Sequence, residues 1–231
     1  MNGDIIQDDL TISAQINLYY DLYVGENVSR PAALLISVHG YGAHKRYMMR
    51  EALAVAPESF VIASVQGPYQ HFRKADDGYR VGFGWLTGHR SDESVALHHK
   101  FLLDVIERHA DEGLIDPERV YLLGFSQACA LNFRFALTYP EALRGIIGIS
   151  GGIPGDIETN PKYRTTQAQA LYLYGDDDEF YPIEKFEEFE GRLRQIFPNF
   201  RAKRFNAPHE ITDEMRHKIR KFLADAASIR S

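Results

Sequence analysis

The 231-residue chain lacks several features that would point to particular classes of protein. It has one cysteine, Cys129, which excludes an internal disulfide. No stretch reaches the roughly 18 apolar residues of a membrane-spanning helix, and the acidic start MNGDIIQDD lacks the basic and apolar regions of a signal peptide. The net charge of −6 argues against a nucleic-acid partner, which needs a basic surface. We therefore expect a cytoplasmic protein without a transmembrane segment.

Motifs for cofactors and metals are also lacking. Neither a phosphate-binding G-x-x-x-x-G-K-[ST] nor a dinucleotide-binding G-x-G-x-x-G stands in a suitable context. The histidines show no zinc-ligand spacing, and the adjacent His98 and His99 of a helical pattern would point in different directions. Cys129 lies in an apolar helical pattern that favours a buried thiol. We expect neither a metal nor an organic cofactor.

What the sequence does contain is a series of short apolar runs separated by helical patterns. The runs are Leu34–Val38, Phe60–Val65, Val120–Leu123, Ile146–Ile149 and Leu171–Tyr174. Such runs are typical of strands buried on both faces of a parallel sheet. The helical patterns are Asp92–His109, Glu184–Phe197 and Asp213–Ala227, the last with Thr212 as its N-cap. The alternation predicts one α/β domain over residues 1–231, with a mostly parallel, doubly wound sheet flanked by helices.

The remaining segments complete this prediction. The N-terminal residues 1–30 contain partial alternation that indicates a strand pair at the sheet edge, Leu10–Ala14 and Asn17–Val24. Arg201–Phe205 indicates a last short strand. Two long segments, Gln66–Arg90 and Gly151–Gln167, are interpreted as loops that line a site (residues 66–90 and 151–167).

One serine lies where a predicted strand meets a predicted helix. The stretch Gly124-Phe125-Ser126-Gln127-Ala128 matches a nucleophile elbow, a strained turn that needs small residues two positions before and after the serine. The Gln127 N–H would begin the helix, where it can stabilise a negative oxygen. The alternative is that Ser126 is only a helix N-cap.

A nucleophilic serine needs a histidine and an acid, which in this architecture follow it in the order Ser, Asp or Glu, His. The run GDDDEFYP follows Leu171–Tyr174, and His209 follows Arg201–Phe205. The only other histidine after Ser126, His217, falls inside the last helical pattern and is expected to be exposed.

A second donor to the negative oxygen should come from the loop after an early strand. His39-Gly40-Tyr41-Gly42 follows Leu34–Val38, and its glycines allow close approach of the backbone. The Tyr41 N–H is the predicted donor. His39 is expected to shape this loop by hydrogen bonding, because His209 already fills the place of the base.

Four motifs together resemble the α/β-hydrolase serine esterases of the phospholipase/carboxylesterase and acyl-protein thioesterase group. They are His39-Gly40-Tyr41-Gly42, Gly124-Phe125-Ser126-Gln127-Ala128, Gly175-Asp176-Asp177-Asp178-Glu179-Phe180-Tyr181-Pro182 and Pro208-His209-Glu210, within a resemblance that runs from about Leu34 to the C-terminus. Counted from Gly175 and Pro182, the acid of the group falls on Asp178, which leaves Asp176 and Asp177 as turn residues. The departures from the group's pattern are Tyr41, the segment Ala43–Arg46, Ala128, Tyr181 and Pro208, and none removes a catalytic group.

The resemblance implies a catalytic triad of Ser126, Asp178 and His209, with the N–H groups of Tyr41 and Gln127 as oxyanion donors. It implies hydrolysis of carboxylic esters or thioesters through an acyl-enzyme. The expected partner is a small-molecule ester or acyl substrate, with no nucleic acid, and a homodimer is left open. A peptidase or acyltransferase with the same triad, or a non-catalytic binding protein of the same fold, are the alternatives.

Four residues are predicted to contact the substrate: His39, Gly40, Phe83 and Trp85. Trp85 resembles the tryptophan that often follows the long loop in this group. The aromatic residues of the loop either wall an acyl pocket or pack among themselves, and the sequence leaves both readings open.

Overall fold

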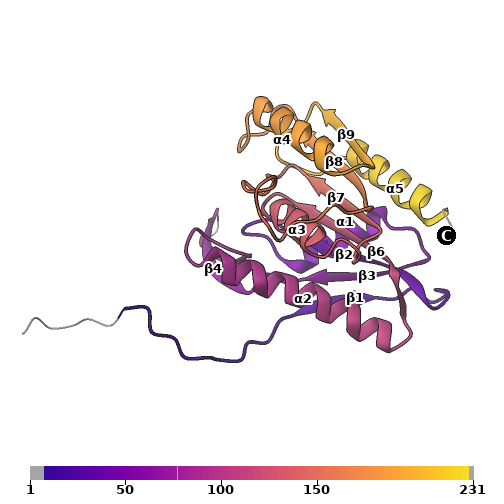
Figure 1. Cartoon of the computed structure of the whole chain (residues 1–231), viewed down its shortest axis with the longest axis horizontal. Coiled ribbons are helices and arrows are strands. Elements are labelled where there is room, and N and C mark those ends of the chain that lie inside the picture. Colours follow the sequence, from indigo (N-terminus) through magenta and orange to yellow (C-terminus); the bar gives the residue numbers. More distant parts are fainter. Residues whose placement is uncertain (1–7, 77, 229–231) are drawn as a thin grey trace, which may run out of the picture.

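The computed structural model describes residues 8–76 and 78–228, which form a sheet of seven strands and a separate two-stranded hairpin, with five helices (Figure 1). The elements are β1 (Tyr20–Tyr23), β2 (Ala32–Val38), α1 (Lys45–Val55), β3 (Phe60–Val65), β4 (Tyr69–Ala75), β5 (Gly78–Gly84), α2 (Ser91–Asp111), β6 (Ile115–Phe125), α3 (Gln127–Thr138), β7 (Gly145–Ile149), β8 (Gln169–Gly175), α4 (Ile183–Ile196), β9 (Phe200–Phe205) and α5 (Asp213–Ser228). The strand order in the large sheet is β1-β3-β2-β6-β7-β8-β9, and only β1 runs antiparallel to its neighbour.

The apolar runs form strands that are buried on both faces, as predicted. Every residue of β2 and β3 is buried. Successive side chains of β2 enter different cores: Leu34 and Ile36 belong to one hydrophobic cluster, and Ala33 and Leu35 belong to the other. This alternation follows from the two-residue period of a strand. A continuous apolar run is therefore what a sheet covered on both sides requires.

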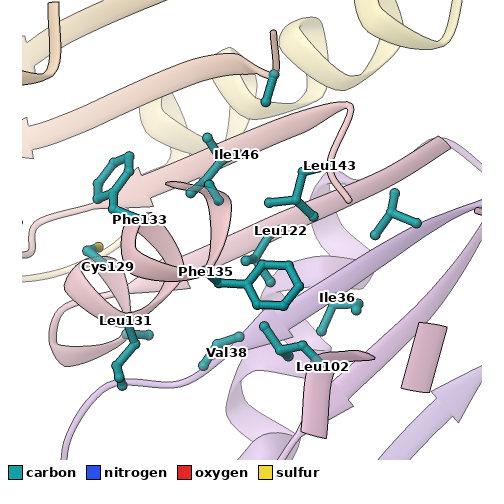
Figure 2. Packing of buried hydrophobic residues seen from close by; sticks show 14 of the residues in the cluster. Ile36, Val38, Leu102, Leu122, Cys129, Leu131, Phe133, Phe135, Leu143 and Ile146 are labelled. Carbon is teal, nitrogen blue, oxygen red and sulfur yellow. The ribbon is translucent and has the colours of Figure 1, made fainter. Parts of the chain in front are cut away.

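The helices divide between the two faces. Side chains of α2, α3 and α4 pack on the first face, and side chains of α1 and α5 pack on the second (Figure 1). Figure 2 shows part of the first core, where Phe133 and Phe135 of α3 lie over Leu122 and Ile146 of the sheet. Burial of each such side chain contributes roughly 1.5–3 kcal/mol. The doubly wound α/β architecture predicted from the sequence is confirmed.

The prediction of two N-terminal strands was wrong for the first of them. β1 covers only Tyr20–Tyr23 at the sheet edge, and Leu10–Ala14 forms no strand. The register explains the difference, because Tyr20 is paired with Val65, the last residue of β3. The chain before β1 therefore passes beyond the end of its only neighbour, and Leu10 and Ile12 are 76% and 96% exposed. Residues 1–7 of this prediction lie outside the described residues.

Three elements, β4, β5 and α1, were not predicted. The segment Gln66–Arg90, interpreted as a loop, contains the antiparallel hairpin of β4 and β5. Most hairpin side chains are exposed on both faces, so the sequence has no apolar alternation to reveal them. Helix α1 follows the His39–Gly42 loop and was also missed. In contrast, Gly151–Gln167 contains neither helix nor strand, as predicted.

The strand order changes direction next to β2, which has β3 on one side and β6 on the other. In open α/β sheets, ligands bind beyond the carboxyl ends of the strands at such a switch point. The strands β2, β6, β8 and β9 end at Val38, Phe125, Gly175 and Phe205. Because they are parallel, the loops that follow them emerge at one edge of the sheet.

Candidate active site

Ser126 lies in a strained turn between β6 and α3. Its φ of 57° and ψ of −121° are unusual for a residue with a side chain. The turn is held by hydrogen bonds from the Ser126 N–H to the Ile149 carbonyl at 2.9 Å and from the Cys129 N–H to the Ser126 carbonyl at 3.0 Å. The Ser126 side chain makes no capping hydrogen bond to the helix. The alternative interpretation of Ser126 as a simple N-cap is therefore wrong.

Small residues around the serine are required by the packing of the turn. A Cβ on Gly124 would lie 2.5 Å from Asn132 Nδ2 and 3.3 Å from the Ala128 methyl. A Cβ on Gly151 would lie 2.1 Å from the Ser126 carbonyl oxygen. The Ala128 methyl itself is fully buried. The turn thus accommodates one methyl at position 128 but has no room for another at position 124.

His209 stands between the serine and an aspartate. Its Nε2 lies 2.9 Å from Ser126 Oγ, and its Nδ1 lies 2.7 Å from Asp178 Oδ2. The Asp178 side chain has no exposed area. Its other oxygen accepts hydrogen bonds from the N–H groups of Phe180 at 2.9 Å and Tyr181 at 3.1 Å, which compensate the buried carboxylate. The predicted serine, histidine and aspartate thus form one hydrogen-bonded series.

The two neighbouring aspartates have other environments. Asp176 accepts a hydrogen bond from Arg204 Nε at 3.0 Å, and Asp177 is exposed. Asp178 alone of the three contacts His209. His217 is exposed on α5, as expected, and Thr212 accepts a hydrogen bond from the Met215 N–H as the predicted N-cap.

Further contacts, which were not predicted, surround the loop that carries His209. Glu179 accepts a hydrogen bond from the His209 N–H at 3.1 Å. Hydrogen bonds from its own backbone N–H and from that of His209 lower the pKa of its carboxyl group. The rings of Phe125 and Phe180 flank the imidazole at 4.9 and 4.6 Å between centroids. A Cβ on Gly175 would lie 2.0 Å from the Ala207 carbonyl oxygen, so the loops after β8 and β9 meet directly.

The two N–H groups predicted to hold a negative oxygen come from separate segments. Neither the Tyr41 N–H nor the Gln127 N–H donates a hydrogen bond to any residue that the structure describes. Gln127 is the first residue of α3, where N–H groups have no partner within the helix. The Tyr41 ring is 62% exposed and stacks on His71 at 4.5 Å.

His39 is buried and joins three segments. Its Nδ1 donates to the Gly40 carbonyl at 2.7 Å, and its Nε2 accepts from the Gly67 N–H and from Gln66 Nε2, both at 2.9 Å. This pattern requires a neutral ring, and burial lowers its pKa from 6.5 to about 4. The prediction that His39 shapes its loop by hydrogen bonding agrees with these contacts.

The other residues predicted to contact substrate have different surroundings. Trp85 is only 1% exposed, and its Nε1 donates to the His39 carbonyl at 2.8 Å. Phe83 is half-buried and exchanges backbone hydrogen bonds with Gly42 and Ala43. A Cβ on Gly40 would lie 3.0 Å from the Ser126 Cβ, so this residue borders the serine. Trp85 thus lies beneath the surface of the site, in the first core.

Cys129 is buried, and burial raises the pKa of its thiol to about 12. Across residues 8–76 and 78–228, no three His, Cys, Asp or Glu side chains are grouped so that they could hold a metal ion. None of the helices in that part of the chain is long and apolar enough to cross a membrane.

Buried histidines are expected to make the stability of the fold decrease at acidic pH. Burial lowers the pKa of both His39 and His99 to about 4, so the unfolded chain binds more protons than the folded chain between pH 6.5 and 4. We expect the free energy of unfolding to fall over that range, by up to about 3 kcal/mol for each histidine. Urea unfolding at pH 7, 6 and 5 measures this change.

Variants separate the histidine contribution from that of the carboxylates. His99→Gln should reduce the dependence of stability on pH, whereas His217→Gln, at an exposed position, should leave it unchanged. Equal pH dependence in the parent chain and in His99→Gln would contradict a neutral, buried His99.

The sheet topology and the strained serine turn at its switch point define an α/β-hydrolase. The model of the phospholipase/carboxylesterase family matches residues 21–227, and the chain belongs to this family.

The chain is also similar to individual proteins that are named esterases or thioesterases. The chain is 29% identical over 105 residues to acyl-protein thioesterase 1 of Gibberella zeae, a match that covers 43% of this chain and 44% of that protein. It is 28% identical over 164 residues to the putative esterase NocK of Nocardia uniformis, with 67% and 42% covered. The matched parts thus span less than half the length of these two relatives. The crystal structure of a Bacillus cereus carboxylesterase has the same fold, with a TM-score of 0.71, 19% identity, and 90% of this chain and 94% of that chain covered.

Proposed function

We propose that this chain hydrolyses carboxylic esters or thioesters of small molecules through an acyl-enzyme on Ser126. The observation that carries the proposal is the hydrogen-bonded series from Ser126 Oγ through His209 to the buried Asp178. Membership of the family and the names of its matched relatives, an esterase and a thioesterase, support the reaction class.

Acylation begins with attack of Ser126 Oγ on the carbonyl carbon. His209 Nε2 accepts the hydroxyl proton as the new C–O bond forms, and Asp178 stabilises the imidazolium through Nδ1–H. Collapse of the tetrahedral intermediate breaks the bond to the leaving group. The imidazolium then gives its proton to the departing alcohol or thiol.

The negative oxygen of the intermediate would be held by the Tyr41 and Gln127 N–H groups. Their lack of partners among the described residues supports this role. Loss of one such donor typically costs about 3 kcal/mol of transition-state stabilisation.

Deacylation repeats the same steps with water as the nucleophile. His209 takes a proton from water, the new C–O bond forms, and collapse returns the proton to Ser126 Oγ as the carboxylic acid leaves. The chain's own side chains thus account for every proton transfer of the cycle.

Labelling with a fluorophosphonate tests the nucleophile. We expect one equivalent of label on Ser126, and we expect Ser126→Ala to take up none while it unfolds at the same urea concentration as the parent. Peptide mapping by mass spectrometry identifies the labelled residue. A chain that takes up no label, and whose Ser126→Ala variant binds ligands as the parent does, would instead be a non-catalytic binding protein.

The substrate class needs a separate measurement. A panel of p-nitrophenyl esters of increasing chain length, tested beside the corresponding thioesters, should show turnover that disappears in Ser126→Ala. Cleavage of amides in preference to esters would indicate the peptidase alternative, and transfer of the acyl group to an added alcohol in preference to water would indicate an acyltransferase.

A further inference from the structure

The two proposed oxyanion donors belong to segments that are far apart in the sequence. Contacts between these segments must therefore fix the position of one N–H group relative to the other. Tyr41 follows β2 and Gln127 begins α3. Two N–H groups that hold one oxygen must keep their geometry to within about 0.5 Å. A link between the two segments, other than the sheet itself, would supply that precision.

The Gln127 side chain provides one half of such a link. Its Oε1 accepts from the Trp85 N–H at 3.0 Å, and its Nε2 donates to the Leu86 carbonyl at 2.9 Å. Both ends of the amide are therefore bound to the backbone that leaves β5. Because these bonds engage the oxygen and the nitrogen together, they fix the orientation of the amide relative to residues 85 and 86.

The same backbone segment holds the loop that carries Tyr41. The Trp85 indole donates to the His39 carbonyl at 2.8 Å. Phe83 accepts from the Gly42 N–H at 2.8 Å and donates to the Ala43 carbonyl at 3.2 Å. These three hydrogen bonds hold the loop before Tyr41, at His39, and after it, at Gly42 and Ala43.

Glycines allow these segments to touch. A Cβ on Gly84 would lie 3.2 Å from the Tyr41 ring, and a Cβ on Gly82 would lie 2.8 Å from the Gly42 carbonyl oxygen. A Cβ on Gly67 would lie 2.6 Å from the Gly84 carbonyl oxygen. The end of β5 thus lies between the loop His39–Gly42 and the start of α3.

We propose that Gln127 is a positioning residue. Its side-chain amide binds the backbone of residues 83–86, and this segment fixes the position of the Tyr41 N–H relative to the Gln127 N–H. The inference rests on the proposed function, in which both N–H groups bind the same negative oxygen. It assigns the β4–β5 hairpin a part in catalysis: its last residues connect the two halves of the oxyanion site.

Gln127→Met tests the proposal, because methionine keeps the length of the side chain, adds no charge and leaves the backbone N–H in place. We expect kcat per fluorophosphonate-titrated site to fall about 10- to 100-fold, with KM nearly unchanged. Binding of an alkyl trifluoromethyl ketone, which forms a tetrahedral adduct with an oxyanion, should weaken by the same factor. Gln195→Met, at an exposed position of α4, is the matched control and should change neither value.

Two further variants examine the same link. Gln127→Glu replaces the donor to the Leu86 carbonyl by a second oxygen, so it should also lower kcat. Trp85→Phe keeps a ring but removes the donor to the His39 carbonyl. Because both residues act through one segment, the effects of Gln127→Met and Trp85→Phe should be less than additive.

A readout that does not depend on turnover completes the test. Trp85 is the only tryptophan of the chain, so fluorescence excited at a wavelength that tyrosine does not absorb comes from this residue alone. In Gln127→Met we expect stronger quenching by acrylamide and faster amide hydrogen exchange at residues 39–43. Unchanged quenching and exchange would overturn the proposal, and so would unchanged kcat in a variant whose exchange had increased. If the parent chain hydrolyses no ester or thioester, the proposed function fails, and the exchange at residues 39–43 then decides the positioning role by itself.

Discussion

Replacement of His209 by alanine is expected to reduce kcat/KM for esters by about four to six orders of magnitude while the chain stays folded. The hydroxyl of Ser126 is a weak nucleophile near neutral pH, and among the described residues His209 is the side chain that forms a hydrogen bond with Ser126 Oγ. Without the imidazole, the proton has no acceptor in the attack and the leaving group has no donor. The residual rate over water would come from the oxyanion donors and from binding alone.

The measurement needs a control that separates catalysis from folding. His217→Ala removes the other histidine that follows Ser126, from an exposed position on α5, and should keep the parent's turnover. Urea unfolding of both variants monitors their stability. Turnover in His209→Ala within tenfold of the parent would show that another group acts as the base.

Asp178→Asn is expected to lower kcat by about 10⁴-fold with little change in KM. Asp178 accepts a hydrogen bond from His209 Nδ1 at 2.7 Å, so it keeps the proton on Nδ1 and leaves Nε2 free to accept from Ser126. An asparagine would present its NH₂ group to Nδ1 in place of an acceptor. The proton would then move to Nε2, and the ring could no longer take the serine proton.

The run of three aspartates offers a matched control for this variant. Asp177→Asn makes the same change one residue earlier, at an exposed side chain, and should leave kcat unchanged. Equal activity in the parent and in Asp178→Asn, with correct folding, would remove Asp178 from the mechanism. If Asp177→Asn lost activity and Asp178→Asn did not, Asp177 and not Asp178 would be the acid of the triad.

The proximity of the three proposed triad residues could be predicted because parallel strands place residues that are far apart in the chain at one edge of the sheet. Ser126, Asp178 and His209 each follow a predicted strand, and parallel strands bring their carboxyl ends to one edge of the sheet. The apolar runs themselves were visible because both faces of the sheet are covered. Neither inference required knowledge of loop geometry.

Some of the missed features had a local signal in the sequence, and others depend on contacts that a pattern of residues does not encode. The β4–β5 hairpin has too few buried side chains for an apolar period, although Asp77-Gly78 in the sequence is typical of a hairpin turn. Helix α1 did carry a signal, since Met48, Ala52 and Val55 are buried at helical spacing. The position of Trp85 in the core depends on its bond to a carbonyl 46 residues earlier, which no local pattern reveals.

The burial of Cys129 has a practical consequence for spectroscopy of this protein. Its thiol is enclosed beneath the serine turn, and its pKa of about 12 leaves almost no thiolate at neutral pH. Because no other cysteine occurs in the chain, a cysteine introduced at a surface position such as Thr87 would be the single site that reacts with a maleimide. Spin labels or fluorophores can therefore be attached to the natural background, without first replacing Cys129, a buried residue in the first turn of α3.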